Sequence, residues 1–187
     1  MFSGCEAFNQ PLGSWNMTSA TSIENMFNGC SVFNQNVNTW NTAGVINMSG
    51  VFSKCPVYDQ PLNLWNTSNA TRMDSMFYRA KAFNQPLSTF NTAKVTAMFN
   101  MFKETDLFNQ PIGNWDVSKV TGNKLPGSLT DSGGFVAGFA GMFMDAKAFN
   151  QDIGNWNVSN ADVFADMFNG AISFNKPLTN WVMTKAI

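Results

Sequence analysis

Three cysteines stand one repeat apart in the sequence, at Cys5, Cys30 and Cys55. If the chain stacks on itself with this spacing, their Cα atoms lie about 5 Å apart, which suits a disulfide between neighbouring coils. The same position is occupied further along by other small residues: Ala80, Thr105, Ala146 and Ala171. This substitution pattern favours a site that needs a small side chain, so we expect buried free thiols and leave the redox state open.

The remaining reactive residues do not form a recognisable catalytic set. Histidine is absent, which excludes Ser-His-Asp and Cys-His nucleophiles and histidine-ligated metals. The sequence contains no CxxC motif that would indicate a zinc site. Its carboxylates are scattered and do not form a calcium-binding loop motif. Asp116 stands in a column that is asparagine in five other units, so it is interpreted as an asparagine replacement rather than a catalytic acid. The sequence therefore predicts no enzyme, no catalytic residue, no cofactor and no metal.

Composition narrows the class of protein further. The chain has 187 residues, of which 44% are hydrophobic and 12% charged, with a formal net charge of -1. This length corresponds to one domain, and the balanced charge gives no field that would attract nucleic acid. No apolar run approaches the roughly 18 residues that a membrane-spanning helix needs, so we expect no membrane span.

A repeat of 25 residues dominates the sequence. The pair Met1-Phe2 marks the start of the units, near residues 1, 26, 51, 76, 101, 142 and 167, with Val51-Phe52 in its place in the third unit. The motif FNQ and a tryptophan recur in the same phase. Because one such unit cannot bury an apolar face alone, while stacked copies can, this periodicity predicts a single solenoid domain over 1–187 with about seven coils.

Within one unit, residues 71–95, the spacing indicates the expected local structure. Met73, Met76, Phe77 and Ala80 follow the i, i+3, i+4, i+7 pattern of a short helix with one buried stripe. The later apolar residues are spaced for turns and very short strands. The predicted fold class is therefore an α/β repeat solenoid, each coil consisting of a short helix, a turn and very short parallel strands.

Two columns of residues are expected to run along the stack as structural ladders. Side-chain amides can pair with turn backbone and bridge coils, and large aromatics can stack in the core. The amide column contains Asn9, Asn34, Asn84, Asn109, Asn150 and Asn175. The aromatic column contains Trp15, Trp40, Trp65, Trp115, Trp156 and Trp181.

One segment interrupts the period. The step from the fifth unit to the sixth is 41 residues, and the extra 16 are assigned to residues 122–137, GNKLPGSLTDSGGFVA. Their Gly, Ser and Pro content predicts an inserted loop. Three interpretations remain open: a neutral surface excursion, a binding loop, or an artefact of the gene model.

The unit MF-x5-FNQPL-x2-WNTS-x-VT-x-M resembles the 25-residue repeat of BspA-like leucine-rich-repeat surface proteins, the type also found in mycoplasma lipoproteins. The segments 82–101 and 108–121 carry the resemblance most clearly. It implies a leucine-rich-repeat-like solenoid with an extracellular or cell-surface, adhesive role, although this chain shows no signal peptide. It supplies no ligand and no catalytic residue.

The expected function is a non-enzymatic structural or adhesive module that binds a protein or glycan through the surface of the solenoid. Specificity is expected at residues whose columns vary between units: Asn69, Lys94, Lys119, Tyr78, Arg79, Lys103 and Glu104. Two alternatives stay open: a binder of a regular lattice (glycan, ice or mineral) through Thr and Asn rows, and an intracellular scaffold subunit. The first and last units lack capping sequences, so end-to-end packing through uncapped ends is a further expectation.

Overall fold

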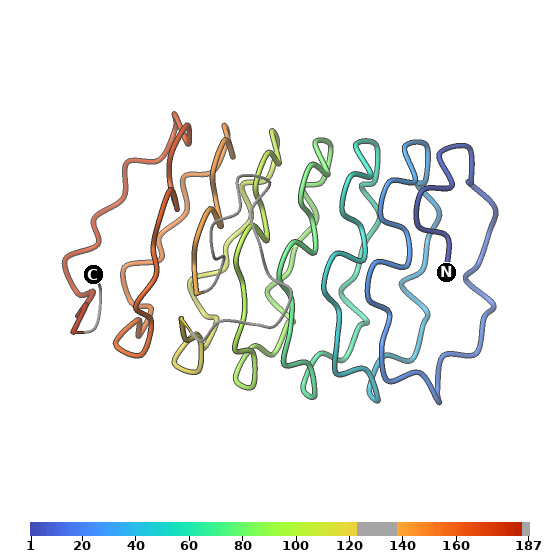
Figure 1. Ribbon diagram of the computed structural model, residues 1–187, viewed down its shortest axis with the longest axis horizontal. Coiled ribbons are helices and arrows are strands. Elements are labelled where there is room, and N and C mark those ends of the chain that lie inside the picture. Colours follow the sequence, from blue (N-terminus) through green and yellow to red (C-terminus); the bar gives the residue numbers. More distant parts are fainter. Residues whose placement is uncertain (123–137, 185–187) are drawn as a thin grey trace.

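The computed structural model describes residues 1–122 and 138–184 as a row of coils that lie side by side. Figure 1 shows the coils following one another along the long axis, from the N-terminus to the C-terminus. Equivalent residues of neighbouring coils lie next to each other. Phe77, for example, stacks on Phe52 and on Phe102, with ring centroids 5.9 and 5.6 Å apart.

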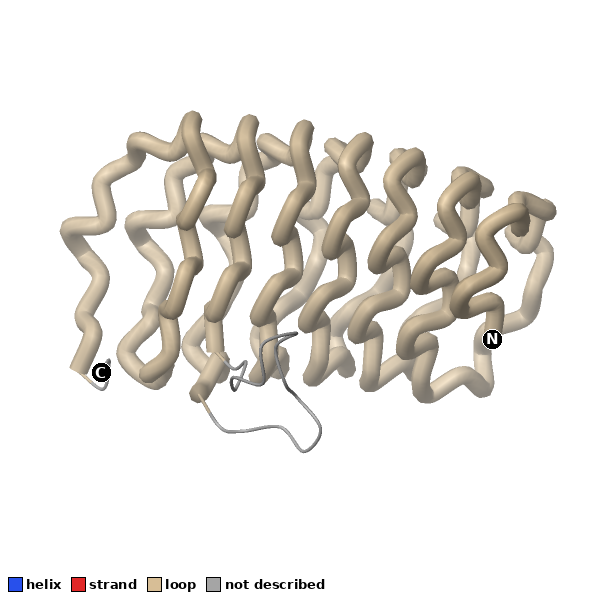
Figure 2. Tube along the Cα trace, turned by 45° about the horizontal axis from the view of Figure 1, so that its top comes forward, coloured by secondary structure: helices blue, strands red, loops and turns tan. Residues whose placement is uncertain are grey.

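The prediction of an α/β, leucine-rich-repeat-like solenoid is wrong. The described residues contain no helix and no extended strand (Figure 2). Strand-like pairing in these residues is limited to isolated parallel bridges that link Ser22, Asn47, Arg72 and Ala97 in succession. The coils therefore lack the helix and strand content of a leucine-rich-repeat solenoid, and each is built from turns joined by irregular extended segments.

Left-handed backbone conformations replace the predicted helix. The segment 24–29 is a run of turns, and within it Asn25 and Gly29 have φ values of 51° and 78°. An α-helix needs consecutive residues with negative φ, so a positive φ at every fourth residue prevents one from forming. Both positions recur as columns with positive φ in successive coils. The first column is Asn25, Gly50, Ser75, Asn100, Gly141 and Asp166, and the second is Gly4, Gly29, Lys54, Arg79, Glu104, Asp145 and Gly170.

The left-handed residues redirect the backbone amides along the stack. The amides of Ile23, Asn25 and Phe27 each donate to a carbonyl of the next coil, at N···O distances of 2.9 to 3.0 Å. The amide of Met26 donates back to the carbonyl of Ile23 and closes a turn inside the coil. Successive turns of this kind return an apolar side chain to the core every three or four residues, which explains the helix-like spacing of the apolar residues.

The rest of the coil is extended chain interrupted by two-residue turns, at 31–32, 38–39 and 43–44 in the second coil. The last of these turns depends on an asparagine side chain, since Asn41 Oδ1 accepts from the amide of Ala43 at 3.2 Å. A threonine hydroxyl then bridges to the following coil, where Thr42 Oγ1 donates to the carbonyl of Asn66. Side chains thus help to connect this part of the coil, together with a few backbone bonds such as that from the amide of Ile46 to the carbonyl of Thr21, whereas a run of backbone bonds connects the segment 23–29.

The core consists of parallel columns of aromatic rings. Phe27 and Phe33 of one coil stack at 4.0 Å between centroids, and each ring lies about 6 Å from its equivalent in the next coil. Trp40 forms a third column, and its indole Nε1 donates to the carbonyl of Leu12 in the preceding coil at 2.9 Å. These rings are buried in the interior coils, so burial of aromatic surface between coils stabilises the stack.

The sequence register resumes after the 16-residue insertion. Apart from Gly122, the predicted loop 122–137 lies outside the described residues. On either side of it, the amide of Phe102 donates to the carbonyl of Met142 at 2.9 Å, and Phe102 stacks on Phe143 with ring centroids 5.7 Å apart. The fifth and sixth coils are therefore in direct contact.

Candidate interaction surfaces

The amide column forms a continuous ladder of hydrogen bonds. Asn84 Oδ1 accepts from the backbone amide of Asn109 and from Gln110 Nε2, both at 3.0 Å. The same pair of bonds recurs at Asn9, Asn34 and Asn109, and Asn150 accepts from the amide of Asn175. Asp59 occupies the column between Asn34 and Asn84 and accepts the same two bonds, so the required group is an acceptor oxygen.

The tryptophan column changes in exposure along the stack. Trp40, Trp65, Trp115 and Trp156 are at most 4% exposed, whereas Trp15 in the first coil is 38% exposed. Each tryptophan after the first donates from its indole to a carbonyl of the coil before it. In the described interior coils the tryptophan side chains are therefore part of the core and link each coil to the one before it. Those of the first and last coils are more exposed.

Two of the residues predicted to bind a partner are joined in an exposed row. Lys94 Nζ donates to Asn69 Oδ1 at 2.7 Å, and Asn69 Nδ2 donates to the carbonyl of Ala43 at 2.9 Å. Lys119 follows one coil further on and is also exposed. The row therefore presents amide and ammonium groups at the coil spacing.

The other four predicted residues form one cluster on two adjacent coils. The Arg79 guanidinium lies 4.9 Å from the centroid of the Tyr78 ring, and Lys103 Nζ lies 5.8 Å from it. Arg79 Nε also pairs with Glu104 Oε2 at 2.8 Å. Tyr78 is half-buried and Arg79 exposed, so an aromatic ring with two cations over it lies at the surface. We call these four residues the Tyr78 cluster.

A buried charged group was missed by sequence reasoning. Asp74 is 5% exposed, and its carboxylate accepts two bonds from Arg72 and one from Ser49 Oγ, at 2.8 to 3.0 Å. The hydrogen bond to Asp74 raises the pKa of Arg72. One feature of the sequence indicated part of this group. Ser49 and Asp74 are 25 residues apart, so they hold equivalent positions in adjacent coils. Its hydrogen bonds are internal to the stack, so we interpret the group as structural.

The cysteine column contains free thiols. Cys5 is exposed, whereas Cys30 and Cys55 are buried, and their thiols donate to the carbonyls of Phe2 and Phe27 with Sγ···O distances of 3.0 Å. Burial raises the pKa of Cys30, and raises that of Cys55 to about 12, with a smaller contribution from the neighbouring thiol. Such thiols are poor nucleophiles. Across 1–122 and 138–184, no three His, Cys, Asp or Glu side chains gather as a metal site would require.

The threonine row considered for lattice binding is uneven. Thr71 and Thr96 use their hydroxyls as donors to carbonyls of the preceding coil, at 3.5 and 3.2 Å. Ile46 interrupts the row and is 48% exposed. No observation here specifically favours a periodic ligand.

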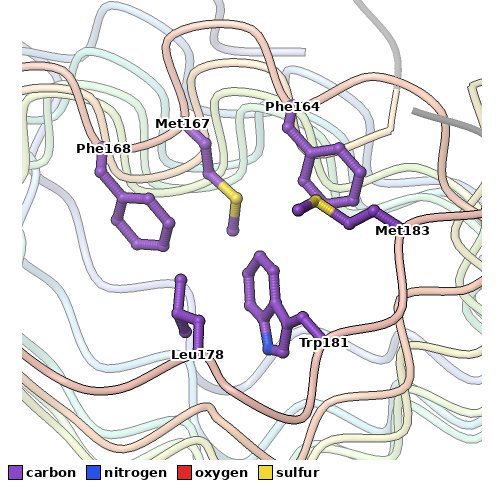
Figure 3. Close-up of a pocket in the computed structure, with 6 residues that line it drawn as sticks. All are labelled: Phe164, Met167, Phe168, Leu178, Trp181 and Met183. Carbon is purple, nitrogen blue, oxygen red and sulfur yellow. The ribbon is translucent and has the colours of Figure 1, made fainter. Parts of the chain in front are cut away.

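The last coil carries an apolar cavity of about 240 Å³. Phe164, Met167, Phe168, Leu178, Trp181 and Met183 line it (Figure 3). Figure 3 shows the rings of Phe164, Phe168 and Trp181 around the same space as the two methionine side chains. In interior coils the equivalent side chains are buried against the next coil.

Stacked coils with three aromatic columns and an amide ladder define a tandem-repeat protein. The chain belongs to the family described as "Mycoplasma protein of unknown function, DUF285", which matches residues 1–56, 25–125 and 133–187. No curated protein and no solved structure matches the chain. Where the structure describes the chain, it contains no helix of the length and apolar character needed to cross a membrane.

Proposed function

We propose that this protein is a non-enzymatic binding module that attaches to a protein or glycan through the side of its stack, at the cell surface. The observation that supports this most directly is the Tyr78 cluster, in which Arg79 and Lys103 lie over one half-buried aromatic ring at the surface. Two cations gathered over one ring suit a ligand with acidic groups.

The rigid backbone beneath the cluster supports the same proposal. The amide of Arg79 donates to the carbonyl of Lys103 at 2.9 Å, and Tyr78 and Lys103 hold equivalent positions in adjacent coils. The backbone positions that carry the ring and both cations are therefore held in register before any ligand arrives, which lowers the entropic cost of binding. The exposed row of Asn69, Lys94 and Lys119 extends the polar surface across three successive coils.

The repeat sequence supports the cell-surface assignment. The repeat resembles that of the BspA-like surface proteins only loosely. The resemblance lies in the repeat motif and does not extend to a leucine-rich-repeat fold. Adhesive proteins of that type use long repetitive surfaces, and this chain presents such a surface.

The test begins with the purified 187-residue protein on glycan and protein arrays, and each hit is measured again with single variants. Tyr78→Ala and Lys103→Ala should each weaken a true hit by about tenfold or more, which corresponds to about 1.4 kcal/mol. Lys147→Ala is the matched control, since it removes an exposed lysine paired with Asp106 in a different coil. If every hit is unaffected by both cluster variants and by Lys94→Ala, the side-surface proposal is wrong.

A further inference from the structure

Three columns of surface residues on the third to sixth coils are each complementary to themselves when the order of the coils is reversed. In every coil they lie just before and just after the buried cysteine column. The first column is Lys54, Arg79, Glu104 and Asp145; the second is Pro56, Lys81, Asp106 and Lys147; the third is Val57, Ala82, Leu107 and Ala148. We call these residues the charged face.

We propose that two copies of this chain pair through the charged face, with their stacks antiparallel and a two-fold axis between the fourth and fifth coils. The partner is thus a second copy of the same chain. The proposal uses interior coils only and goes beyond the function proposed above. Arg79 and Glu104 also belong to the Tyr78 cluster, so a second copy and a ligand of that cluster compete for these two side chains.

The first column is a regular row of charges. Its four residues share one backbone conformation, with φ values of 56 to 59°. The amides of Arg79 and Glu104 donate to carbonyls of the next coil at 2.9 and 2.8 Å, so the steps along the row are alike. The four side chains therefore start from equivalent backbone positions and follow one another along the stack.

The second column lies beside the first on the same surface. Lys147 Nζ pairs with Asp106 Oδ1 at 2.9 Å. The pKa of Lys147 is raised by Asp106, and the carboxylates of Asp145 and Glu104 add to the rise. Charges from both columns thus act on one another, and a second copy that meets one column meets the other as well.

Reversal of one copy brings opposite charges together. In the first column, Lys54 of one copy faces Asp145 of the other, and Arg79 faces Glu104. The same holds in the second column, where the lysine of the fourth coil faces the aspartate of the fifth. A parallel pair would place each charge against its own equivalent, so like charges would meet. Charge complementarity therefore selects the antiparallel arrangement.

Two charges of the first column lack an ion-pair partner within the described residues. Arg79 Nε pairs with Glu104 Oε2 at 2.8 Å in the same chain. By contrast, Lys54 and Asp145 form no salt bridge in residues 1–122 and 138–184. Antiparallel pairing gives each of them a partner and joins the Arg79–Glu104 pairs of the two copies into a network. Networks contribute more than isolated surface pairs.

The third column supplies the apolar contact. Val57 and Leu107 are 44% and 55% exposed. Across the axis, Val57 faces Ala148 and Leu107 faces Ala82, so each large side chain meets a small one. This contact removes exposed apolar surface from water, which favours association.

The interface is isologous, because both copies use the same surface. Pairing covers the charged face of both copies, so association through this face stops at a dimer.

The test measures the mass of the full 187-residue chain by sedimentation and light scattering across a concentration series. The mass should rise to twice that of the monomer and then stay constant. Added salt should weaken the dimer, because it screens surface charges. Lys54→Asp and Asp145→Lys should each raise the Kd by about tenfold or more, since like charges then meet twice in each dimer.

The double variant with both changes tests the register. It exchanges the two charges within one chain, which restores both opposite-charge pairs of an antiparallel dimer but not of a parallel one. Its Kd should return to within about threefold of the unmodified value. Lys119→Asp reverses an exposed lysine outside the charged face and should leave the Kd unchanged.

A covalent test reports the register without relying on charge. In a Cys5→Ser, Cys30→Ala, Cys55→Ala background, Val57→Cys together with Ala148→Cys should give a disulfide-linked dimer under mild oxidation. The two positions lie three coils apart within a chain and meet only across the axis. Either new cysteine alone should give no cross-link.

Three results would overturn the proposal. The first is an unmodified protein that stays monomeric at every concentration. The second is a Lys54→Asp, Asp145→Lys double variant that dimerises no better than either single variant. The third is cross-linking by Val57→Cys alone, which would mean that the copies pair in parallel. Mass is measured without a ligand, so failure of this proposal is distinguishable from failure of the proposed function.

Discussion

Replacing Asn84 by alanine tests whether the amide ladder joins the coils through its acceptor oxygen. Asn84 Oδ1 accepts from the backbone amide of Asn109 and from Gln110 Nε2, both at 3.0 Å. Alanine removes the acceptor for both donors at once. The two donors are partly buried in the interior of the stack, where water replaces the lost oxygen poorly.

The structure gives the expected magnitude. Each lost hydrogen bond contributes about 1 kcal/mol net, and a partly buried donor left without a partner adds a share of its desolvation cost. Asn84→Ala should therefore lower the free energy of unfolding by about 2 to 3 kcal/mol. For a chain of this length, that corresponds to a Tm lower by about 5 to 10 °C.

The matched control is Asn84→Asp. Asp59 occupies the same column in the preceding coil and accepts from the amide of Asn84 at 2.9 Å and from Gln85 Nε2 at 3.0 Å. The aspartate variant keeps the acceptor oxygen, so urea unfolding at neutral pH should show less than about a third of the alanine effect. Equal losses for the two variants would refute the reasoning, because the column would then require the amide nitrogen.

Three further predictions follow from the core. Tyr58→Phe should raise the free energy of unfolding by about 1 kcal/mol, since the buried Tyr58 hydroxyl has no partner in the described structure; a loss measured by urea unfolding would contradict this. Phe77→Ala should lower it by about 3 to 5 kcal/mol, because Phe77 is fully buried and stacks on three rings; a loss below about 1 kcal/mol would place the ring outside the core. Cys55 should resist alkylation at pH 8.5 while Cys5 reacts, as mass spectrometry can show. Since the folded pKa of Cys55 is raised from 9.0 to about 12, its contribution to stability is complete below pH 9 and is lost as the pH rises from 9 toward 12.

The sequence period was sufficient to identify neighbours in the stack. Residues 25 apart, such as Asn84 and Asn109, occupy equivalent places in adjacent coils, and the structure joins them by a hydrogen bond. This relation follows from repetition alone, because equal units that stack must bring equal positions together.

The local structure could not be derived from the same period. Met73, Met76, Phe77 and Ala80 have helical spacing and are all buried, but two successive turns produce that spacing as well as a helix does. The positions with positive φ prevent a helix. In residues 71–95, the unit from which a helix is predicted, these positions are Ser75 and Arg79, and neither residue type signals a positive φ. Other units have glycine at these places. Reading the columns across all units would have indicated positive φ.

The candidate site was only partly accessible to sequence reasoning. Variable columns pointed to Tyr78 and Lys103, but the contact between the lysine and the ring depends on how the turns direct the two side chains. The buried Asp74 group depends on a bidentate contact from Arg72, which the turn geometry of one coil creates. The residue spacing of a helix or a strand predicts neither the contact of Lys103 with Tyr78 nor that of Arg72 with Asp74.

The connection of each coil only to its immediate neighbours has a consequence for how the molecule opens. In the described residues every hydrogen bond between coils links one coil to the next, so the stability of an interior coil depends on two interfaces and that of a terminal coil on one. Unfolding should therefore begin by fraying from the ends and advance coil by coil, with amide exchange slowest near Phe77 and faster toward both termini. The same arrangement lets the length of the molecule change by whole units, because adding or removing one interior coil recreates the interface that was there before.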